Sequence, residues 1–323
     1  MHRYSYYKTA ACTPNVSIGD PQANKEEILN CIQKLDSDTQ LVVFPELCIT
    51  GYTCQDLFYE HTLLNKAKQV LFEIVEELPE NLVAVLGLPL EIDNKLYNCA
   101  AICFNHDILG IQVKTYIPSY NEFYETRWFS SASELKENTT FTYKDKKVPV
   151  SNHIVFKDTT TFACLGVEIC EDLWVTIPVS STHALAGANV LCNLSASNEI
   201  ISKANYRRNL VKDQSAKCYA GYIYTSAGPT ESSSDLVFSG HNLICENGAI
   251  LSETKTDKII YGQIDLDHLN HDRLHYKTSM QNLFHVNYTT VEFASKPIHE
   301  IEFDRYIDAY PFVPNNQDER ITR

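Results

Sequence analysis

The sequence lacks several patterns that would assign it to a common class of protein. Its 11 cysteines include no C-x-x-C pair and no zinc-ribbon spacing, and an odd number cannot all pair in disulfides. The first residues, MHRYSYYKTAACTP, contain no apolar core of a signal peptide, and no run approaches the roughly 18 apolar residues of a membrane span. We therefore expect a cytoplasmic protein with reduced thiols and no membrane contact.

Positive charge is also scarce. The chain has 27 lysines and arginines against 41 aspartates and glutamates, for a formal net charge of −14. Binding to nucleic acid or anionic lipid needs a basic face, so both are disfavoured as partners. With 44% hydrophobic and 21% charged residues, the 323-residue chain has a globular composition and can bury one large core. Small solutes are the expected partners.

Short apolar segments alternate with amphipathic ones along the chain. Ile28, Ile32 and Leu35 recur at helical spacing after Asp20 and Pro21, which suit an N-cap and a first helical position. Further helices are expected over residues 56–80, near 182–187 and over about 201–219. Strands are expected over residues 40–46, 81–89, 98–105, 107–115, 161–169, 189–195, 222–228, 236–245, 248–254 and 259–265. The alternation predicts an α/β fold in which two mixed sheets form one layered sandwich with helices outside, without a linker inside residues 1–300.

Three reactive side chains follow apolar strands at equivalent positions. Glu46 follows LVVFP, Lys114 follows DILGIQV, and Cys170 follows FACLGVEI. A buried strand holds the side chain at its end rigidly at one edge of the sheet, where α/β folds usually build their sites. Each residue alone is more often a solvated charge or a core cysteine, but the three together predict a site.

The three groups suit nucleophilic attack on an unactivated amide. A thiol is mostly protonated at neutral pH, so it needs a base, and an ammonium nearby favours the thiolate. Glu46 can take the thiol proton, while Lys114 and the backbone N–H after Cys170 can stabilise an oxyanion. A papain-like pair of Cys170 with a histidine stays open at this stage.

These residues resemble the pattern of the nitrilase superfamily of carbon–nitrogen hydrolases, which has a Glu at FPE, a Lys after a strand and a Cys followed by an acid. Within it, the chain resembles the glutaminase domains of glutamine-dependent NAD synthetases. The segments that carry the similarity are TPNVSIGDPQAN, FPELCITGYTCQDLF, KTYIPSYNEFYETRWF, CEDLWV, NLSAS, DLVFSGHN and YPFVP. The resemblance spans essentially the whole chain and implies a four-layer αββα sandwich.

The resemblance also implies roles for further residues. Glu122, eight residues after Lys114, matches the second glutamate that supports the Glu–Lys–Cys triad. Five residues match positions that line the glutamine pocket or recognise the amino-acid end of the substrate: Tyr120, Phe123, Glu171, Ser197 and Lys203. Some relatives carry an arginine where this chain has Lys203, and a lysine cannot offer the same planar fork to a carboxylate.

The function that the resemblance implies is glutamine hydrolysis through a Cys170 thioester, with no cofactor, to supply ammonia for NAD synthesis from deamido-NAD. Residues 1–309 would form the glutaminase domain, and residues 310–323 would begin an interdomain linker or form an exposed tail. The Ser-Gly-Gly-x-Asp-Ser loop of the synthetase domain is absent from the sequence. We therefore expect a separate ammonia-dependent synthetase domain or subunit as partner, and a homo-oligomer. The alternatives are another nitrilase-type amidase or carbamoyl hydrolase, and a catalytically silent scaffold.

Two other motifs are expected to be structural. His268, His271 and His275 have the spacing of one helical face, but no acid or cysteine cluster nearby completes a metal site, so no metal is predicted. The run ESSSDLVFSG, residues 231–240, lacks the G-K-[ST] of a phosphate-binding loop. It is expected to form a turn that lines the entrance of the site.

Overall fold

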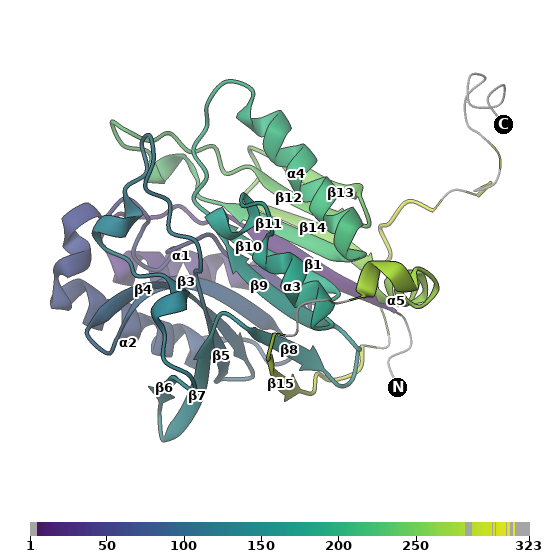
Figure 1. The fold of residues 1–323 in the computed structure, drawn as a ribbon, viewed down its shortest axis with the longest axis horizontal. Helices are drawn as coiled ribbons and strands as arrows, with labels where there is room; N and C mark the ends of the chain where they lie inside the picture. Colours follow the sequence, from purple (N-terminus) through teal and green to yellow (C-terminus); the bar gives the residue numbers. More distant parts are fainter. Residues whose placement is uncertain are drawn as a thin grey trace.

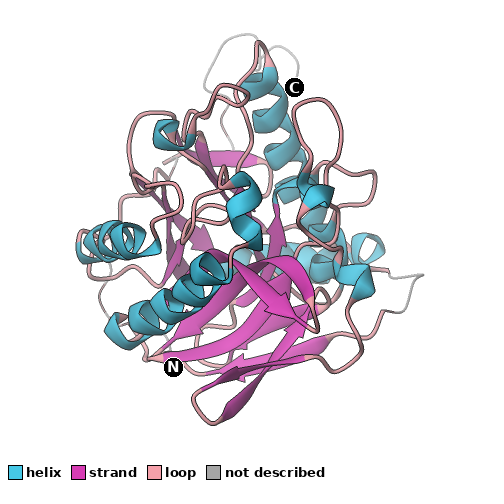
Figure 2. Cartoon of the chain, turned by 90° about the vertical axis from the view of Figure 1, so that its left-hand side faces the viewer, coloured by secondary structure: helices cyan, strands magenta, loops and turns pink. Residues whose placement is uncertain are grey.

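Two mixed β-sheets pack against each other, and helices cover their outer faces (Figures 1 and 2). The computed structural model describes residues 5–281, 286–298, 300, 302–307, 309–310 and 313. The arrangement confirms the predicted α/β fold with two mixed sheets and outer helices. Within the described residues, no helix has both the length and the apolar character needed to cross a membrane.

Within the described residues the first sheet has eight strands. Three of its neighbouring pairs are parallel and four are antiparallel. In spatial order they are β14 (Ile259–Asp265), β1 (Tyr6–Cys12), β2 (Leu41–Val43), β3 (Val83–Ile92), β4 (Lys95–Phe104), β5 (Asp107–Val113), β7 (Lys146–Ser151) and β6 (Thr140–Tyr143). Two-residue turns with positive φ join β3 to β4 at Asp93–Asn94 and β4 to β5 at Asn105–His106. Such turns match the twist of antiparallel strands. They require positive φ, which Asn and Asp adopt more readily than most residues.

The second sheet has seven strands, and its central strands β9, β10 and β11 run parallel. In spatial order they are β13 (Ala249–Thr254), β12 (Asn242–Glu246), β11 (Gly221–Ser226), β10 (Val190–Ser195), β9 (Cys164–Ile169), β8 (Ile154–Asp158) and β15 (Thr289–Phe293). The strand β15 comes late in the chain and adds in parallel to the edge strand β8.

Five α-helices and six short 3-10 turns are present in the described part of the chain. The helices are α1 (Pro21–Gln33), α2 (His61–Glu77), α3 (Val179–Leu185), α4 (Lys203–Cys218) and α5 (Leu266–His275); the 3-10 turns are η1 (Gln55–Tyr59), η2 (Glu125–Arg127), η3 (Ala132–Glu134), η4 (Cys170–Leu173), η5 (Pro229–Glu231) and η6 (Lys277–Met280). One apolar cluster joins α1 and α2 to the first sheet, and another joins α3 and α4 to the second. A third cluster fills the space between the sheets, which gives the layer order αββα.

Helix α1 begins as the sequence predicts. Asp20 is its N-cap and accepts a hydrogen bond from the backbone N–H of Ala23 at 3.1 Å, and Pro21 occupies the first helical position. Ile28 and Ile32 are buried against the first sheet. The predicted apolar spacing therefore marks the face that packs on the core.

The single helix predicted over residues 56–80 is wrong, because the chain forms η1 and then α2 with a break at Glu60. The backbone of Glu60 is extended, with φ −86° and ψ 112°. Phe58 of η1 is buried and its ring packs edge-on against the rings of Trp128 and Phe129, at centroid distances of 5.7 and 5.0 Å. η1 therefore packs on residues 128 and 129, and the extended Glu60 separates it from α2.

The strand predicted over residues 236–245 is also shorter than expected. Only Asn242–Glu246 pair as β12, while the preceding residues form a loop. In that loop Leu236 and Phe238 are buried in an apolar cluster with Tyr52 and Phe123. These apolar side chains are therefore buried by packing in a loop and do not mark a strand.

The chain stays attached to the fold after β15. The Arg305 guanidinium donates to the carboxylate of Glu246 and, at 2.9 Å, to the carbonyl oxygen of Gln263. The tail predicted for residues 310–323 lies outside the described residues, apart from Tyr310 and Val313. The domain boundary at residue 309 therefore stays a prediction.

Candidate active site

The three reactive side chains meet between the two sheets. Glu46 follows β2 and Lys114 directly follows β5 in the first sheet, whereas Cys170 directly follows β9 in the second. Glu46 and Lys114 have no exposed surface, and Cys170 is 6% exposed. The strand-end positions thus bring the three groups together from both sheets.

Lys114 is surrounded by carboxylate oxygens. Its Nζ lies 2.6 Å from Oε1 of Glu46 and 2.9 and 2.7 Å from the two carboxylate oxygens of Glu125. Glu46 also accepts a hydrogen bond from Nδ2 of Asn98 at 2.7 Å and one from the backbone N–H of Ala196 at 2.8 Å. Both oxygens of Glu46 are therefore held in fixed directions.

The charges in this cluster stabilise one another. Burial by itself lowers the pKa of Lys114, but Glu125 and Glu46 outweigh it and hold that pKa well above its ordinary value. Burial raises the pKa of Glu125 to about 7, although Lys114 opposes the rise. The hydroxyl of Tyr52 donates to Glu125 Oε1 at 2.7 Å and completes its hydrogen bonding. Lys114 is therefore a fixed cation.

Cys170 occupies a strained backbone conformation at the start of η4. Its φ is 47°, a left-handed conformation that costs a residue other than glycine about 1–3 kcal/mol. Burial raises the pKa of the Cys170 thiol, Glu46 raises it further, and Lys114 opposes both. The thiol thus carries its proton at neutral pH while it lies within the electrostatic reach of a carboxylate that can accept that proton.

Asp172 connects the strand that ends at Cys170 to the strand that ends at Lys114. Its Oδ1 accepts hydrogen bonds from the backbone N–H groups of Thr115 and Tyr116 at 3.0 and 2.9 Å, and its Oδ2 accepts one from Ile169 at 3.1 Å. Burial raises the pKa of Asp172 to about 8. The second acid of the CEDLW segment therefore has a structural role.

The second glutamate beside Lys114 is Glu125, which the sequence reasoning missed in favour of Glu122. The carboxylate of Glu122 instead accepts a hydrogen bond from Nδ2 of Asn198. Glu125 opens η2, where its N–H bonds to the carbonyl oxygen of Pro118 at 3.1 Å and the side chain is buried, whereas Glu122 lies in the preceding turn and is only partly buried. Glu122 therefore does not support Lys114 directly.

Of the five predicted substrate residues, Tyr120 and Glu171 form one pair. The Tyr120 hydroxyl donates to the Glu171 carboxylate, with distances of 3.0 and 2.9 Å to its two oxygens. Burial raises the pKa of Glu171, and the Tyr120 hydrogen bond opposes the rise. The ring of Phe123 packs edge-on against Tyr120 at a centroid distance of 5.9 Å. These residues place a carboxylate directly after Cys170 in the chain.

Lys203 is the first residue of α4, and Ser197 lies in the segment between β10 and α4. The Lys203 ammonium lies 5.4 Å from the Phe123 ring centroid and 5.3 Å from that of Trp174, and it donates to the side-chain oxygen of Asn198. Burial lowers the pKa of Lys203, while the nearby carboxylates of Glu122 and Glu171 oppose that change. Ser197 Oγ accepts a hydrogen bond from the guanidinium of Arg207 at 3.1 Å. The site thus carries a cation as well as a carboxylate near the thiol.

A small cavity lies beside the cluster. Tyr52, Glu122, Phe123, Glu125 and Leu236 are among the residues that line it. Ser233 also contributes, so the segment 231–240 borders this cavity. Its place at the entrance of the site stays a prediction.

The histidines of α5 lie apart from these groups. His268 contacts Asp272 at 3.6 Å, and the rings of His271 and His275 are 4.0 Å apart. Within the part of the chain that the structure describes, no group of three or more His, Cys, Asp or Glu side chains could hold a metal ion. The residues around Cys170 belong to a site built from a thiol, carboxylates and ammonium groups.

The fold and this site define a carbon–nitrogen hydrolase. The carbon–nitrogen hydrolase family matches residues 8–273, and the chain belongs to it. The chain is similar to the glutamine-dependent NAD(+) synthetase of Mycobacterium tuberculosis, with 35% identity over 327 residues that cover 97% of this chain and 48% of that protein. The human glutamine-dependent NAD(+) synthetase is 29% identical over 255 residues, which cover 76% of this chain and 35% of that protein. The chain spans about half the length of the curated relatives it matches.

Solved structures show the same relation. A glutamine-dependent NAD(+) synthetase from Cytophaga hutchinsonii superposes with a TM-score of 0.69 and 28% identity, covering 80% of this chain and 43% of that one. Nit3 of Saccharomyces cerevisiae, a member of branch 10 of the nitrilase superfamily, superposes with a TM-score of 0.67 and 20% identity, covering 86% and 97%. The second match establishes the fold alone. The chain therefore has the nitrilase fold and resembles the glutaminase part of glutamine-dependent NAD synthetase.

Proposed function

We propose that this chain is a glutaminase that hydrolyses the side-chain amide of glutamine to glutamate and ammonia. The observation that carries the proposal is the buried cluster of Lys114 with Glu46 and Glu125 beside Cys170, because it combines a base, a cation and a thiol. The similarity to glutamine-dependent NAD synthetases supports glutamine as the substrate.

Catalysis begins with proton transfer from Cys170 Sγ to a carboxylate oxygen of Glu46 as the sulfur attacks the amide carbon. Lys114 Nζ and the backbone N–H of Glu171 stabilise the oxyanion that forms. The proton on Glu46 then passes to the leaving nitrogen, so ammonia departs and a glutamyl thioester stays on Cys170. Water, deprotonated by Glu46, attacks the thioester and releases glutamate, and the thiol recovers its proton. Glu125 keeps Lys114 charged and in place throughout.

The residues around the thiol suit the amino-acid end of the substrate. The Glu171 carboxylate, held by Tyr120, provides a negative group for the α-ammonium of glutamine. Lys203 provides a positive group for the α-carboxylate, and Ser197 adds a hydroxyl near it. The ring of Phe123 packs against Tyr120 and lies beside the Lys203 ammonium, so it borders both partners of the amino-acid end. These contacts favour an α-amino acid amide over a simple aliphatic amide.

We further propose that the ammonia supplies NAD synthesis from deamido-NAD on a synthetase domain or subunit. The support is that relatives with this region at about half their length are glutamine-dependent NAD synthetases. Self-association of the glutaminase part also stays a prediction, to be measured by light scattering.

Ammonia release from glutamine, asparagine and N-carbamoyl amino acids tests the proposed activity. We expect kcat/KM for glutamine to exceed that for asparagine by at least about tenfold, because the shorter side chain misplaces the amide when its charged end is bound. Preference for an N-carbamoyl amino acid would instead support the carbamoyl hydrolase alternative. Absence of hydrolysis of every amide would favour a silent scaffold.

A further inference from the structure

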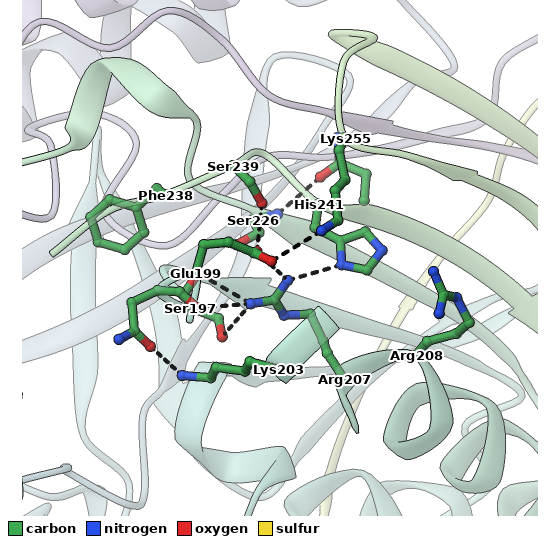
Figure 3. A network of polar contacts seen from close by, with 12 residues as sticks. Ser197, Glu199, Lys203, Arg207, Arg208, Ser226, Phe238, Ser239, His241 and Lys255 are labelled. Atoms are coloured by element: carbon green, nitrogen blue, oxygen red, sulfur yellow. Dashed lines mark hydrogen bonds and ion pairs between the residues drawn. The ribbon is translucent and has the colours of Figure 1, made fainter. Parts of the chain in front are cut away.

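Arg207 is a fully buried cation that takes no part in the mechanism above. It lies on α4, one turn after Lys203, and its side chain has no exposed surface. Figure 3 shows its guanidinium directed toward Ser197 on one side and toward Glu199 and His241 on the other. A buried guanidinium loses its hydration, so its position must be explained by the groups that it contacts.

One guanidinium nitrogen holds the segment 196–199, which joins β10 to α4. Arg207 Nη2 donates to Ser197 Oγ at 3.1 Å and to the carbonyl oxygen of Asn198 at 2.9 Å, with a longer contact of 3.5 Å to the carbonyl oxygen of Ser197. Because trans peptides are planar, fixing a carbonyl group also fixes the direction of the following N–H. Arg207 therefore sets both the backbone and a side chain of this segment.

The opposite side of the same segment contacts the candidate active site. The backbone N–H of Ala196 donates to Oε2 of Glu46 at 2.8 Å. The side-chain amide of Asn198 bridges two groups of the site, because it donates to Glu122 and accepts from Lys203. The segment 196–199 thus lies between the catalytic cluster and Arg207.

The second terminal nitrogen of the Arg207 guanidinium contacts a histidine and a glutamate. Its Nη1 lies 2.9 Å from Nδ1 of His241 and 3.3 Å from Oε2 of Glu199. A neutral imidazole protonated at Nε2 satisfies both His241 contacts, since Nδ1 then accepts from the guanidinium and Nε2 donates to Glu253 at 2.7 Å. Burial lowers the pKa of His241, and the nearby Arg207 charge lowers it further. The guanidinium therefore faces an acceptor and not a second cation.

Further contacts fix Glu199 as well. Ser239 Oγ donates to Oε2 of Glu199 at 2.8 Å, and Lys255 Nζ donates to its Oε1 at 3.0 Å (Figure 3). Nε of Arg207 is buried and has no hydrogen-bond partner among the described residues. A buried charge with an unsatisfied N–H is a poor source of stability, which points to a role for Arg207 in geometry.

We propose that Arg207 is a positioning residue that fixes segment 196–199 and thereby sets recognition of the amino-acid end of the substrate, without touching the substrate. The proposal rests on the glutaminase function proposed above. Recognition is affected more than bond cleavage, because the guanidinium binds Ser197 and Asn198 directly, whereas Glu46 is also held by Lys114 and Asn98. A lysine at position 207 keeps the charge but cannot form the same planar fork.

The test compares Arg207→Lys with Arg208→Lys, the same substitution one residue further along α4. Arg208 pairs with Glu253 and donates to Asn205, and its hydrogen bonds to the described residues do not reach segment 196–199. We expect Arg207→Lys to raise KM for glutamine by about tenfold to a hundredfold while kcat changes less, since small displacements of binding groups have effects of this size. The control Arg208→Lys should keep both parameters within about twofold.

Two thiol reagents then separate recognition from a general structural defect. A chloroketone analogue of glutamine needs the amino-acid subsite to reach Cys170, whereas iodoacetamide does not. In Arg207→Lys we expect slower labelling of Cys170 by the chloroketone, by the same factor as the rise in KM, and unchanged labelling by iodoacetamide. If Arg207→Lys does not fold, Glu199→Gln weakens the ion pair from a partly exposed position and should show the same pattern with a smaller change.

Each outcome decides between the proposals. Equal kinetics for wild type and Arg207→Lys would overturn the positioning role while leaving glutamine hydrolysis in place. Equal slowing of both reagents would also overturn it, because the defect would then extend to the thiol itself. A wild-type chain that hydrolyses no glutamine, and whose Cys170 reacts no faster with the chloroketone than with iodoacetamide, would overturn the proposed function and with it this role.

Discussion

Lys114 and Arg207 are both fully buried cations, but their partners differ in kind. The hydrogen bonds of Lys114 Nζ all go to the carboxylates of Glu46 and Glu125. Most hydrogen bonds of Arg207 go to neutral groups, namely backbone carbonyls, a hydroxyl and an imidazole. Its carboxylate partner Glu199 lies 3.3 Å away, farther than the carboxylates of Lys114. One buried cation is thus held among carboxylates beside Cys170, and the other is held mainly by neutral groups of segment 196–199 and by His241.

The largest effect is expected at the thiol that the Lys114 cluster serves. Cys170→Ala removes the nucleophile, so ammonia release from glutamine should fall by at least about 10⁴-fold. Thermal unfolding should change little, because the substitution removes a single sulfur atom and keeps the β-carbon that packs between the sheets. Substantial ammonia release by this variant would show that Cys170 is not the nucleophile.

Lys114→Met tests the charge itself, since methionine has a similar length and no ammonium. Turnover should fall by at least about a hundredfold, the loss typical of removing one oxyanion donor. The free energy of unfolding should also fall, by about 3–5 kcal/mol, because Glu46 and Glu125 lose their buried partner. Denaturant unfolding and steady-state kinetics measure the two effects. Near-normal turnover would mean that Lys114 is not needed for the reaction, and the contrast with Arg207 would disappear.

Glu125→Gln and Glu122→Gln decide which glutamate supports Lys114. Glutamine has the shape of glutamate without its charge, and loss of a charged hydrogen bond costs about 1.5–3 kcal/mol. We therefore expect kcat to fall by about tenfold to a hundredfold in Glu125→Gln. In Glu122→Gln the change should be mainly in KM, through the contact with Asn198. The opposite order of effects on kcat would restore Glu122 as the supporting residue.

The smallest effect concerns Glu231, which holds the segment that carries Tyr52. Its Oε2 accepts a hydrogen bond from the backbone N–H of Tyr52 at 2.7 Å, and burial raises the pKa of Glu231 from about 4.5 to about 8. Because the folded chain binds this proton more tightly than the unfolded chain, the stabilisation is complete below the ordinary pKa and is lost as pH rises through about 8.

Glu231→Gln cannot titrate and serves as the reference for that effect. The Tm of wild type relative to Glu231→Gln should therefore decrease by a few degrees between about pH 5 and about pH 9. Differential scanning calorimetry at several pH values measures the difference. A constant difference across this range would show that Glu231 is ionised in the fold at neutral pH.

The sequence predicts that Glu46, Lys114 and Cys170 come together, because each follows an apolar strand whose end fixes its direction. It does not distinguish Glu125 from Glu122, since the loop between Lys114 and η2 has no periodicity and only its folding shows which side chain turns inward. The break at Glu60 is equally hidden, because the amphipathic pattern continues through it while the packing of Phe58 depends on Trp128 and Phe129.

The burial of Arg207 could not be predicted from the sequence for a different reason. The buried face of α4 carries polar Gln214 and Ser215 as well as apolar Val211 and Cys218, so the pattern of apolar residues does not mark Arg207 as buried. Its burial depends on Glu199, His241 and the carbonyl groups of segment 196–199, which come together only in the folded chain. A residue that acts through backbone contacts leaves little trace in the pattern of residue types.

Trapping of the acyl group by hydroxylamine tests the central claim most directly, because it detects the thioester even when the intermediate does not accumulate. Wild-type protein is incubated with glutamine and increasing hydroxylamine, and ammonia, glutamate and γ-glutamyl hydroxamate are measured together. A Cys170 thioester predicts that hydroxamate replaces glutamate as hydroxylamine increases, and that Cys170→Ala forms neither product. Glutamate formation with no hydroxamate at any hydroxylamine concentration would contradict the account, because water would then attack the amide without a covalent intermediate.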